Sequence, residues 1–283
     1  KAGKDSNPYT ELLSFLEQQN PFFQNYHADA DHLDTIVQLV GLAAKLSRQE
    51  TETNIESVDA LTFQPLQSVF SGLFLHQEKA KSYFPTKPLN LSNLLPTDEQ
   101  NTDLGILVSS FLDELKKINN ELQFLHLLEK YFWSISSSGS PDISLYDEIK
   151  TTAAIATCLY QQYQQGFLDM ANLDEQSEQC LLIHGDVSGI QRFIFNIPSK
   201  GAAKSLKGRS VYIGLLSGVI VRHILDELDL YDTNLLYNGG GNFFILAPAY
   251  KKEKFQEVRA NILRHILAAH DGDVYFAMDY VSV

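Results

Sequence analysis

Hydrophobic positions recur at helical spacing over much of the first 170 residues. Between 31 and 49, for example, Leu33 and Val37 are four residues apart, as are Ile36 and Val40, which places these residues on one face of a helix. Similar periods predict three further helices, at 103–117, 119–134 and 144–170. A shorter apolar alternation at 61–75 predicts a strand pair. The first part of the chain is therefore predicted to be mainly helical.

The pattern changes after Cys180, where short apolar runs alternate with two long helical periods. Strands are predicted at 181–186, at 274–281 and in a hairpin over 235–247, and helices at 205–230 and 251–270. Their order is β-α-β-β-α-β, the ferredoxin-like arrangement. In the first of these helices, Leu215 and Val219 are expected to face the core, and Gly214 and Gly218 to let the helix lie close against the sheet. The whole chain is thus expected to be an α+β protein.

The hairpin carries the most informative motif, Asn238-Gly239-Gly240-Gly241-Asn242 between two apolar runs. Glycines in such a turn supply the positive φ angles that tight hairpins require. Hairpins of this kind in nucleotide-polymerising palm domains present two acidic residues to a metal ion, but here Gly241 and Asn242 occupy those positions. Asp186, at the end of the first predicted strand, has the place of the remaining acid. One carboxylate and one amide make a poor cage for two Mg²⁺ ions, so an alternative role for Asp186 is to cap the turn at 187–189.

Composition narrows the class of protein. Of the 283 residues, 44% are apolar and 20% are charged, values typical of a soluble globular chain. Two cysteines cannot form a four-thiolate zinc site, and they do not suggest a disulfide framework. The sequence shows no apolar run long enough to cross a bilayer and no secretory leader pattern. We therefore expect a cytoplasmic protein without membrane association.

The charge is unevenly distributed. The net charge of the chain is −13, yet residues 181–283 are nearly neutral, and the stretch from Val187 to Leu225 contains no acidic residue. That stretch holds six basic residues: Arg192, Lys200, Lys204, Lys207, Arg209 and Arg222. A local basic strip in an acidic protein indicates a phosphate-bearing partner, and a helix start adjacent to it favours anions. The alternative is a solvated loop and helix start that happen to be basic.

Three motifs carry a resemblance to a known family. The run from His184 to Phe195 (HGDVSGIQRFIF), the run from Ser205 to Ser210 (SLKGRS) and the glycine hairpin resemble the first palm domain of the large subunit of type III CRISPR effector complexes. Residues 141–147 and 150–156 are similar to the segment that precedes this palm, and residues 30–50 resemble the end of the family's HD-type domain. The pattern is closer to the III-A branch than to III-B.

The resemblance implies two domains: a mainly helical, degenerate or truncated HD-type domain at 1–175, and a ferredoxin-like palm at 176–283. Family members work in an RNA-guided antiviral complex with other subunits, CRISPR RNA and target RNA. Their two palms convert ATP to cyclic oligoadenylates with divalent metal such as Mg²⁺, and their HD domain cuts single-stranded DNA. The first palm has a degenerate hairpin and helps to bind one ATP.

On this resemblance, the chain is expected to contribute an ATP-binding half-site and to be inactive alone. The nucleotide-binding candidates are Asp186, Ser188, Gly189, Lys204, Lys207, Arg209, Gly239, Gly240, Gly241 and Asn242. No catalytic residue is predicted. Two alternatives stay open: a non-catalytic scaffold that docks neighbouring subunits and guide RNA, and a fragment of an HD-type single-stranded DNA nuclease.

Departures from the family pattern concern the metal sites. The chain has no adjacent His-Asp pair, no acidic second hairpin and no cysteine cluster, so it is expected to be a fragment or a naturally short relative. His27 and Asp186 are the candidate metal ligands. His27 belongs to a local His/Asp cluster that includes His32, and the alternative for this cluster is a polar loop that caps the following helix. Glu148 stands where the family commonly has His.

Overall fold

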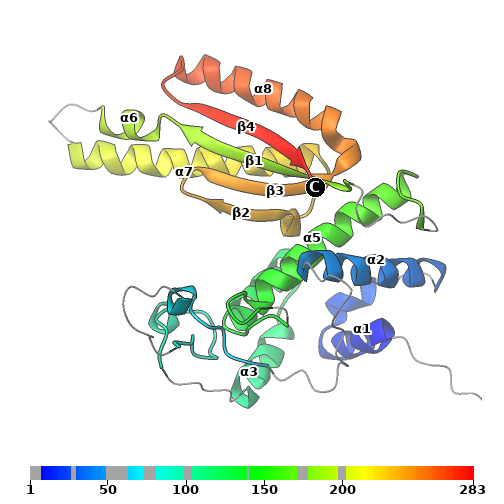
Figure 1. The fold of residues 1–283 in the computed structure, drawn as a ribbon. Helices are drawn as coiled ribbons and strands as arrows, with labels where there is room; N and C mark the ends of the chain where they lie inside the picture. Colours follow the sequence, from blue (N-terminus) through cyan, green and yellow to red (C-terminus); the bar gives the residue numbers. More distant parts are fainter. Residues whose placement is uncertain are drawn as a thin grey trace, which may run out of the picture. The chain divides into compact units, whose positions relative to one another are not determined.

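A computed structural model describes residues 8–26, 30–48, 63–72, 81–98, 104–138, 140–170, 178–196 and 202–283. The chain divides into two compact units, Lys1–Ile149 and Lys150–Val283, whose elements are labelled in Figure 1. Each unit is described by itself below. Among the helices of the described residues, none is long and apolar enough to cross a membrane.

The first unit is mainly helical, as the spacing of its apolar residues predicts. Its α-helices are α1 (Pro8–Gln19), α2 (Ala30–Arg48), α3 (Gly105–Leu115), α4 (Glu121–Phe132) and the start of α5 (Leu145–Gln164), with short 3-10 turns η1 (Pro21–Asn25), η2 (Val69–Gly72) and η3 (Leu91–Asn93). The predicted strand pair at 61–75 is wrong for its described part. Residues 63–72 form only isolated bridges, Pro65 with Ile135 and Gln67 with Tyr83, followed by η2.

Buried polar groups fix the helices of this unit. Asn20 is 5% exposed, and its Nδ2 donates to the carbonyls of Leu115 and Ile118, both at 2.8 Å. Its Oδ1 accepts from the backbone N–H of Phe22 at 2.9 Å. One side chain thus caps η1 and bonds the carbonyls of Leu115, at the end of α3, and of Ile118, just after it.

The second unit contains a four-stranded antiparallel sheet. Its strands are β1 (Cys180–Ser188), β2 (Leu235–Gly239), β3 (Asn242–Pro248) and β4 (Tyr275–Ser282), in the spatial order β2-β3-β1-β4. The helices are α6 (Ile190–Phe195), α7 (Ala202–Glu227) and α8 (Lys252–His270), with 3-10 turns η5 (Asp232–Asn234) and η6 (Ala249–Lys251). Apart from the short α6, the β-α-β-β-α-β order is the predicted one.

The two faces of the sheet have different partners. Alternate residues such as Ile183, Ile245 and Phe276 are at most 2% exposed and pack with α7 and α8 in one core. On the opposite face, Leu182 and Leu246 pack with α5. The alternation follows from the two-residue period of a strand, and it leaves the end of this second face nearest the β2–β3 turn outside the α5 contact.

A buried asparagine joins α5 to the sheet. Asn234 is fully buried, and its Nδ2 donates to Leu246 O at 2.9 Å and to Ala154 O at 3.4 Å. Its Oδ1 accepts from the backbone N–H of Tyr231 at 3.2 Å. Because a buried amide needs such partners, these bonds hold residues 150–164 of α5 within the second unit, ahead of the domain boundary predicted at 176.

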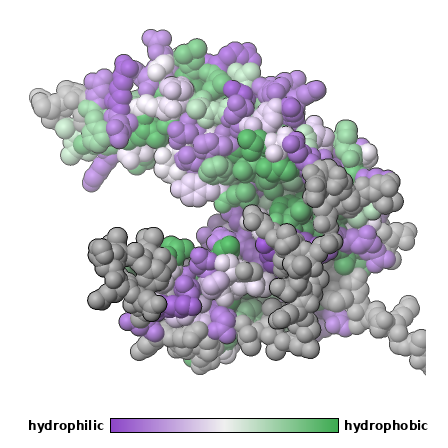
Figure 2. Space-filling view, in the orientation of Figure 1, coloured by the Kyte–Doolittle hydropathy of each residue, from purple (hydrophilic) through white to green (hydrophobic). Residues whose placement is uncertain are grey.

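The helix predicted at 205–230 differs from α7 in start and orientation. It begins at Ala202, and Leu215 and Val219 are each 65% exposed instead of buried. A Cβ added at Gly214 or Gly218 would meet nothing within 4 Å, so these glycines do not lie against the sheet. Figure 2 shows hydrophobic side chains at the surface of this unit among hydrophilic ones. The buried stripe instead runs through Ile213, Ser217, Ile220, Val221, Ile224 and Leu225.

Candidate functional site

The glycine hairpin forms as predicted and is held against the end of β1. Gly240 (φ 63°) and Gly241 (φ 88°) both have positive φ, the geometry of a two-residue type I′ turn. The N–H of Val187 donates to Gly241 O at 2.8 Å. A Cβ at Gly241 would lie 2.8 Å from Cδ1 of Ile190, so this position requires glycine for both conformation and space.

A polar cross-strand chain lies beside the turn. Asp186 on β1 is the register partner of Asn242 on β3, and Asn242 Nδ2 donates to Asp186 Oδ1 at 3.4 Å. His184 Nε2 lies 3.1 Å from Asn242 Oδ1, so it donates to that oxygen when it carries the proton. These three half-buried side chains occupy the sheet face opposite α7 and α8.

The proposed turn-capping role of Asp186 does not match the structure. β1 continues through Ser188, so residues 187 and 188 are strand and not turn. Gly189 follows as the N-cap of α6 with φ 85°, and a Cβ there would lie 2.5 Å from Asp273 O. Asp186 therefore faces Asn242 from within the strand, and Gly189 is required by the close approach of the 273 backbone.

The basic candidates lie at the start of a helix. Lys204, Lys207 and Arg209 are within the first turns of α7. Ser217, one of the α7 residues that contacts β2, bonds Asn238 at 3.2 Å. At a rise of 1.5 Å per residue, Lys207 lies ~15 Å further along the helix axis, and Figure 1 shows α7 extending past the hairpin.

Three of the six basic residues of the strip have partners within the protein. Arg192 lies 3.4 Å from Asp273, and Arg222 lies 2.7 Å from Asp232. The guanidinium of Arg209 donates to the carbonyls of Phe193 and Asn196 at the end of α6, and its Cζ is 5.0 Å from the Phe193 ring centroid. Arg209 thus anchors α6 to α7. Lys204 and Lys207 are exposed, whereas Lys200 lies outside the described residues.

The residues present do not fit a two-metal cage. Beside the hairpin, Asp186 supplies one carboxylate, and the amide oxygen of Asn242 is already engaged by His184. Mg²⁺ sites of polymerase type use several charged oxygens. Across the described part of the chain, no group of three or more His, Cys, Asp or Glu side chains is arranged to hold a metal ion.

The other metal candidate, His27, lies outside the described residues, and its neighbour His32 is an exposed residue of α2. Glu148, at the position where the family commonly has His, has a structural role. Its carboxylate lies 3.1 Å from Arg48 Nε and accepts from the Ser138 backbone N–H at 3.1 Å. This carboxylate therefore ties α2 and the 138 loop to the start of α5.

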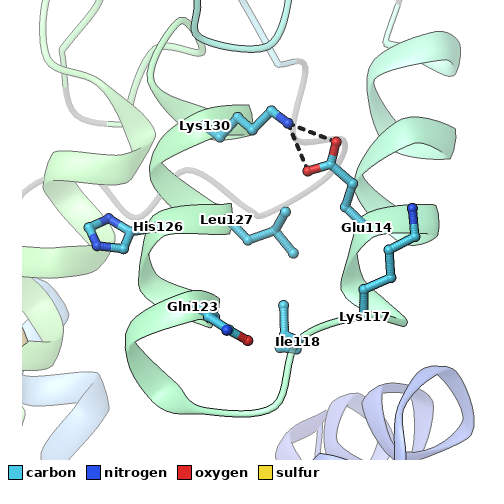
Figure 3. Close-up of a pocket in the computed structure, with 7 residues that line it drawn as sticks. All are labelled: Glu114, Lys117, Ile118, Gln123, His126, Leu127 and Lys130. Carbon is cyan, nitrogen blue, oxygen red and sulfur yellow. Dashed lines mark hydrogen bonds and ion pairs between the residues drawn. The ribbon is translucent and has the colours of Figure 1, made fainter.

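A groove in the first unit offers little ligand chemistry. It lies between α3 and α4 (Figure 3) and is lined in part by Glu114, Lys117, Gln123 and Lys130. Lys130 Nζ contacts both oxygens of Glu114, at 2.7 and 2.8 Å, and this bond lowers the pKa of the Glu114 carboxyl. The charges of Glu114 and Lys130 are matched within the groove, and none of the candidate residues lines it.

Two aromatic residues beside the polar chain were not among the sequence candidates. The rings of His184 and Phe244 are stacked, with centroids 4.5 Å apart and planes at 17°. Tyr237 on β2 is the register partner of Phe244 and is 53% exposed. The sequence feature that could have identified them is the alternation of side chains along a strand. It places His184 and Asp186 on one face of the sheet and Ile183 and Val187 on the other.

Comparison with known proteins identifies the family to which the chain belongs. Residues 179–283 match the family model described as Csm1 subunit domain B. The chain is 36% identical over 294 residues to the "CRISPR system single-strand-specific deoxyribonuclease Cas10/Csm1 (subtype III-A)" of Methanocaldococcus jannaschii, a match that covers 89% of this chain and 37% of that protein. This chain thus spans little more than a third of that relative.

Solved structures show the same similarity. A Csm1-Csm4 cassette in complex with one ATP matches with a TM-score of 0.73 and 26% identity, over 96% of this chain and 36% of that chain. A Csm1-Csm4 cassette in complex with cA4 matches with a TM-score of 0.71 and 26% identity, over the same shares. The chain is therefore a homologue of the Cas10/Csm1 large subunit of type III-A CRISPR complexes, and its residues 179–283 correspond to Csm1 domain B.

Proposed function

We propose that the chain contributes an ATP-binding half-site to cyclic oligoadenylate synthesis in a type III-A CRISPR effector complex. In this proposal residues 176–283 are a ferredoxin-like palm and residues 1–175 a degenerate HD-type domain. The catalytic carboxylates belong to a second palm outside this chain. The complex is cytoplasmic, and its other partners are a Csm4-like subunit, CRISPR RNA and target RNA.

The observation that carries the proposal is the Asp186–Asn242 pair beside the Gly240–Gly241 turn. Glycine backbone allows a ligand to approach closely. The side chains of Asp186 and Asn242 beside the turn lie on the sheet face that α7 and α8 do not cover. A homologous Csm1 was solved with ATP, which supports nucleotide binding here. A single carboxylate explains why this half is expected to bind without catalysing.

The hairpin can be tested with a substitution that keeps its backbone. Asparagine tolerates positive φ, and a Cβ at Gly240 would meet nothing within 4 Å. Gly240→Asn should therefore keep the turn while adding bulk where the nucleotide approaches. Gly166→Asn is the matched control, since Gly166 also has positive φ (75°) and open space.

We expect ATP, titrated calorimetrically, to bind the wild-type chain and the Gly166→Asn variant alike, and the Gly240→Asn variant at least about tenfold more weakly, a loss of about 1.4 kcal/mol. Equal affinity in all three would remove the hairpin from the nucleotide site. No ATP binding by the wild-type chain, with intact assembly into the complex, would favour the scaffold alternative.

A further inference from the structure

The short helix α6 lies directly against the glycine turn. Its first residue is Ile190. A Cβ added at Gly241 would lie 2.8 Å from Ile190 Cδ1 and 3.1 Å from Val187 Cβ, so these two side chains form the surface on which the second glycine of the turn rests. A displacement of α6 would therefore remove one of the two supports of the turn.

α6 is too short to be stable on its own. It has six residues, whereas isolated helices shorter than ~12–15 residues are marginal in water. The ion pair of Arg192 with Asp273 joins side chains that are 75% and 56% exposed, and such exposed pairs contribute little. The helix therefore depends on contacts of its apolar side chains and of its terminal carbonyls.

Arg209 of α7 supplies both kinds of contact. Its Nη1 donates to the carbonyl oxygens of Phe193 and Asn196, the latter at 3.0 Å, and carbonyls at a helix end have no partner inside the helix. Its Cζ lies 5.0 Å from the centroid of the Phe193 ring. The same ring contacts Tyr212 and His270, with centroids 5.9 Å away in each case. The C-terminal end of α6 is thereby fixed to α7 and α8.

We propose that Arg209 is a positioning residue for the nucleotide half-site, because by capping α6 it keeps Ile190 against the turn at Gly241. The effect on ATP rests on the proposed function. This role differs from the phosphate contact expected from the basic strip, since Nη1 is already engaged by two carbonyls. Lysine replaces this side chain only in part, because the planar guanidinium combines the two bonds with the ring contact.

The first experiment needs no nucleotide. Hydrogen exchange, measured by mass spectrometry, is compared between the wild-type chain and the variants Arg209→Met, Arg209→Lys, Ile190→Ala and Arg264→Met. Arg209→Met keeps an apolar stem and removes the donors. Arg264 is the matched control, because it is an exposed arginine of α8 that bonds Ala260 O, within its own helix, at 3.4 Å.

Arg209→Met should speed exchange over 193–196 about 10- to 100-fold, the range that follows from the loss of hydrogen bonds to a charged group. It should also speed exchange of the Val187 N–H, which donates to the turn at 2.8 Å. Arg209→Lys should recover part of the protection, Ile190→Ala should affect Val187 more than 193–196, and Arg264→Met should match the wild type. Faster exchange over 193–196 with an unchanged Val187 would overturn the positioning role.

The second experiment separates positioning from phosphate contact. ATP, ADP and AMP are titrated calorimetrically against the same proteins. A positioning residue should lower all three affinities by the same factor, about 2- to 30-fold for Arg209→Met, whereas the loss of a phosphate ligand grows with the number of phosphates. The double variant of Arg209→Met with Ile190→Ala should bind no more weakly than the weaker single variant, because both changes act through one contact.

Three outcomes decide between the explanations. Losses that grow from AMP to ATP would overturn the proposal and assign Arg209 to the phosphates. Additive losses in the double variant would overturn the path through Ile190. An absence of ATP binding by the wild-type chain would contradict the proposed function alone, because hydrogen exchange measures the link between Arg209 and the turn without nucleotide.

Discussion

Restoring an acid to the hairpin tests why this half of the site lacks one. Asn242→Asp converts the amide that donates to Asp186 Oδ1 at 3.4 Å into a carboxylate at the same distance. The variant should be destabilised without metal and recover stability when a divalent cation bridges the two carboxylates. The wild-type chain should show no such response, because it offers one carboxylate.

The magnitude follows from the distance. Two unit charges 3.4 Å apart repel by about 1 kcal/mol in bulk water and about 5 kcal/mol at an effective dielectric constant of 20. The pair is half-buried, and His184 Nε2 can donate to the second oxygen when it carries the proton, so we expect a loss of about 2 kcal/mol at pH 7. The loss should shrink in acid, because protonating one carboxyl removes the repulsion.

Urea unfolding followed by circular dichroism, with and without Mn²⁺, measures this effect. Asn261→Asp on the exposed side of α8 controls for adding a charge, and the double variant Asp186→Asn with Asn242→Asp restores a single carboxylate. The double variant should regain most of the lost stability. The reasoning is refuted if Asn242→Asp is as stable as the Asn261→Asp control and gains nothing from metal.

Three further predictions concern the frame of the site. Gly241→Ala should lower the free energy of unfolding by roughly 1–3 kcal/mol more than Gly240→Ala, because only at Gly241 does the new Cβ lie 2.8 Å from a neighbouring side chain; equal losses in urea unfolding would contradict this. Asn234→Ala should lower the free energy of unfolding by about 2–4 kcal/mol, because it removes buried hydrogen bonds. The exposed control Asn261→Ala should lower it by less than about 0.5 kcal/mol. An equally small loss for Asn234→Ala would argue against the attachment of α5 to the sheet. Burial raises the pKa of the Cys158 thiol, so its share of stability is present below the ordinary thiol pKa and is lost as pH rises above it. A chromogenic disulfide should therefore label this thiol only as fast as the protein opens, and rapid labelling of the native chain at pH 8 would contradict its burial.

The sequence anticipated the features that depend on local period and turn chemistry. The turn at Gly240–Gly241 has the positive φ angles that its glycines suggest. Asp186 and Asn242 meet because the β-α-β-β-α-β order makes β1 and β3 neighbours. Both results follow from backbone rules that hold whatever the distant packing.

The misses have tertiary causes. The spacing of Leu215 and Val219 fits an apolar helical stripe, but both are exposed. The buried stripe of α7 is narrower and is centred on Ile213, Ile220 and Ile224. Tertiary packing decides which apolar residues of the helix are buried. Arg209 was a candidate for nucleotide binding because it lies in a basic stretch, but its guanidinium donates to backbone carbonyls at the end of α6.

The stack of His184 on Phe244 was missed for a related reason. His184 and Phe244 lie 60 residues apart in the sequence, and their stack depends on strand register. Alternation indicates that they share a face with Asp186 and Asn242, but it does not show that α5 stops one row short of them.

The most direct test of the account measures ATP binding and turnover in one sample. The purified 283-residue chain is incubated with labelled ATP and Mg²⁺ or Mn²⁺, bound nucleotide is measured by equilibrium dialysis, and products are separated by chromatography. We predict saturable binding of ATP without synthesis of cyclic oligoadenylate. Synthesis of cyclic oligoadenylate by this chain alone, or an absence of ATP binding, would contradict its assignment as a nucleotide-binding, non-catalytic half-site.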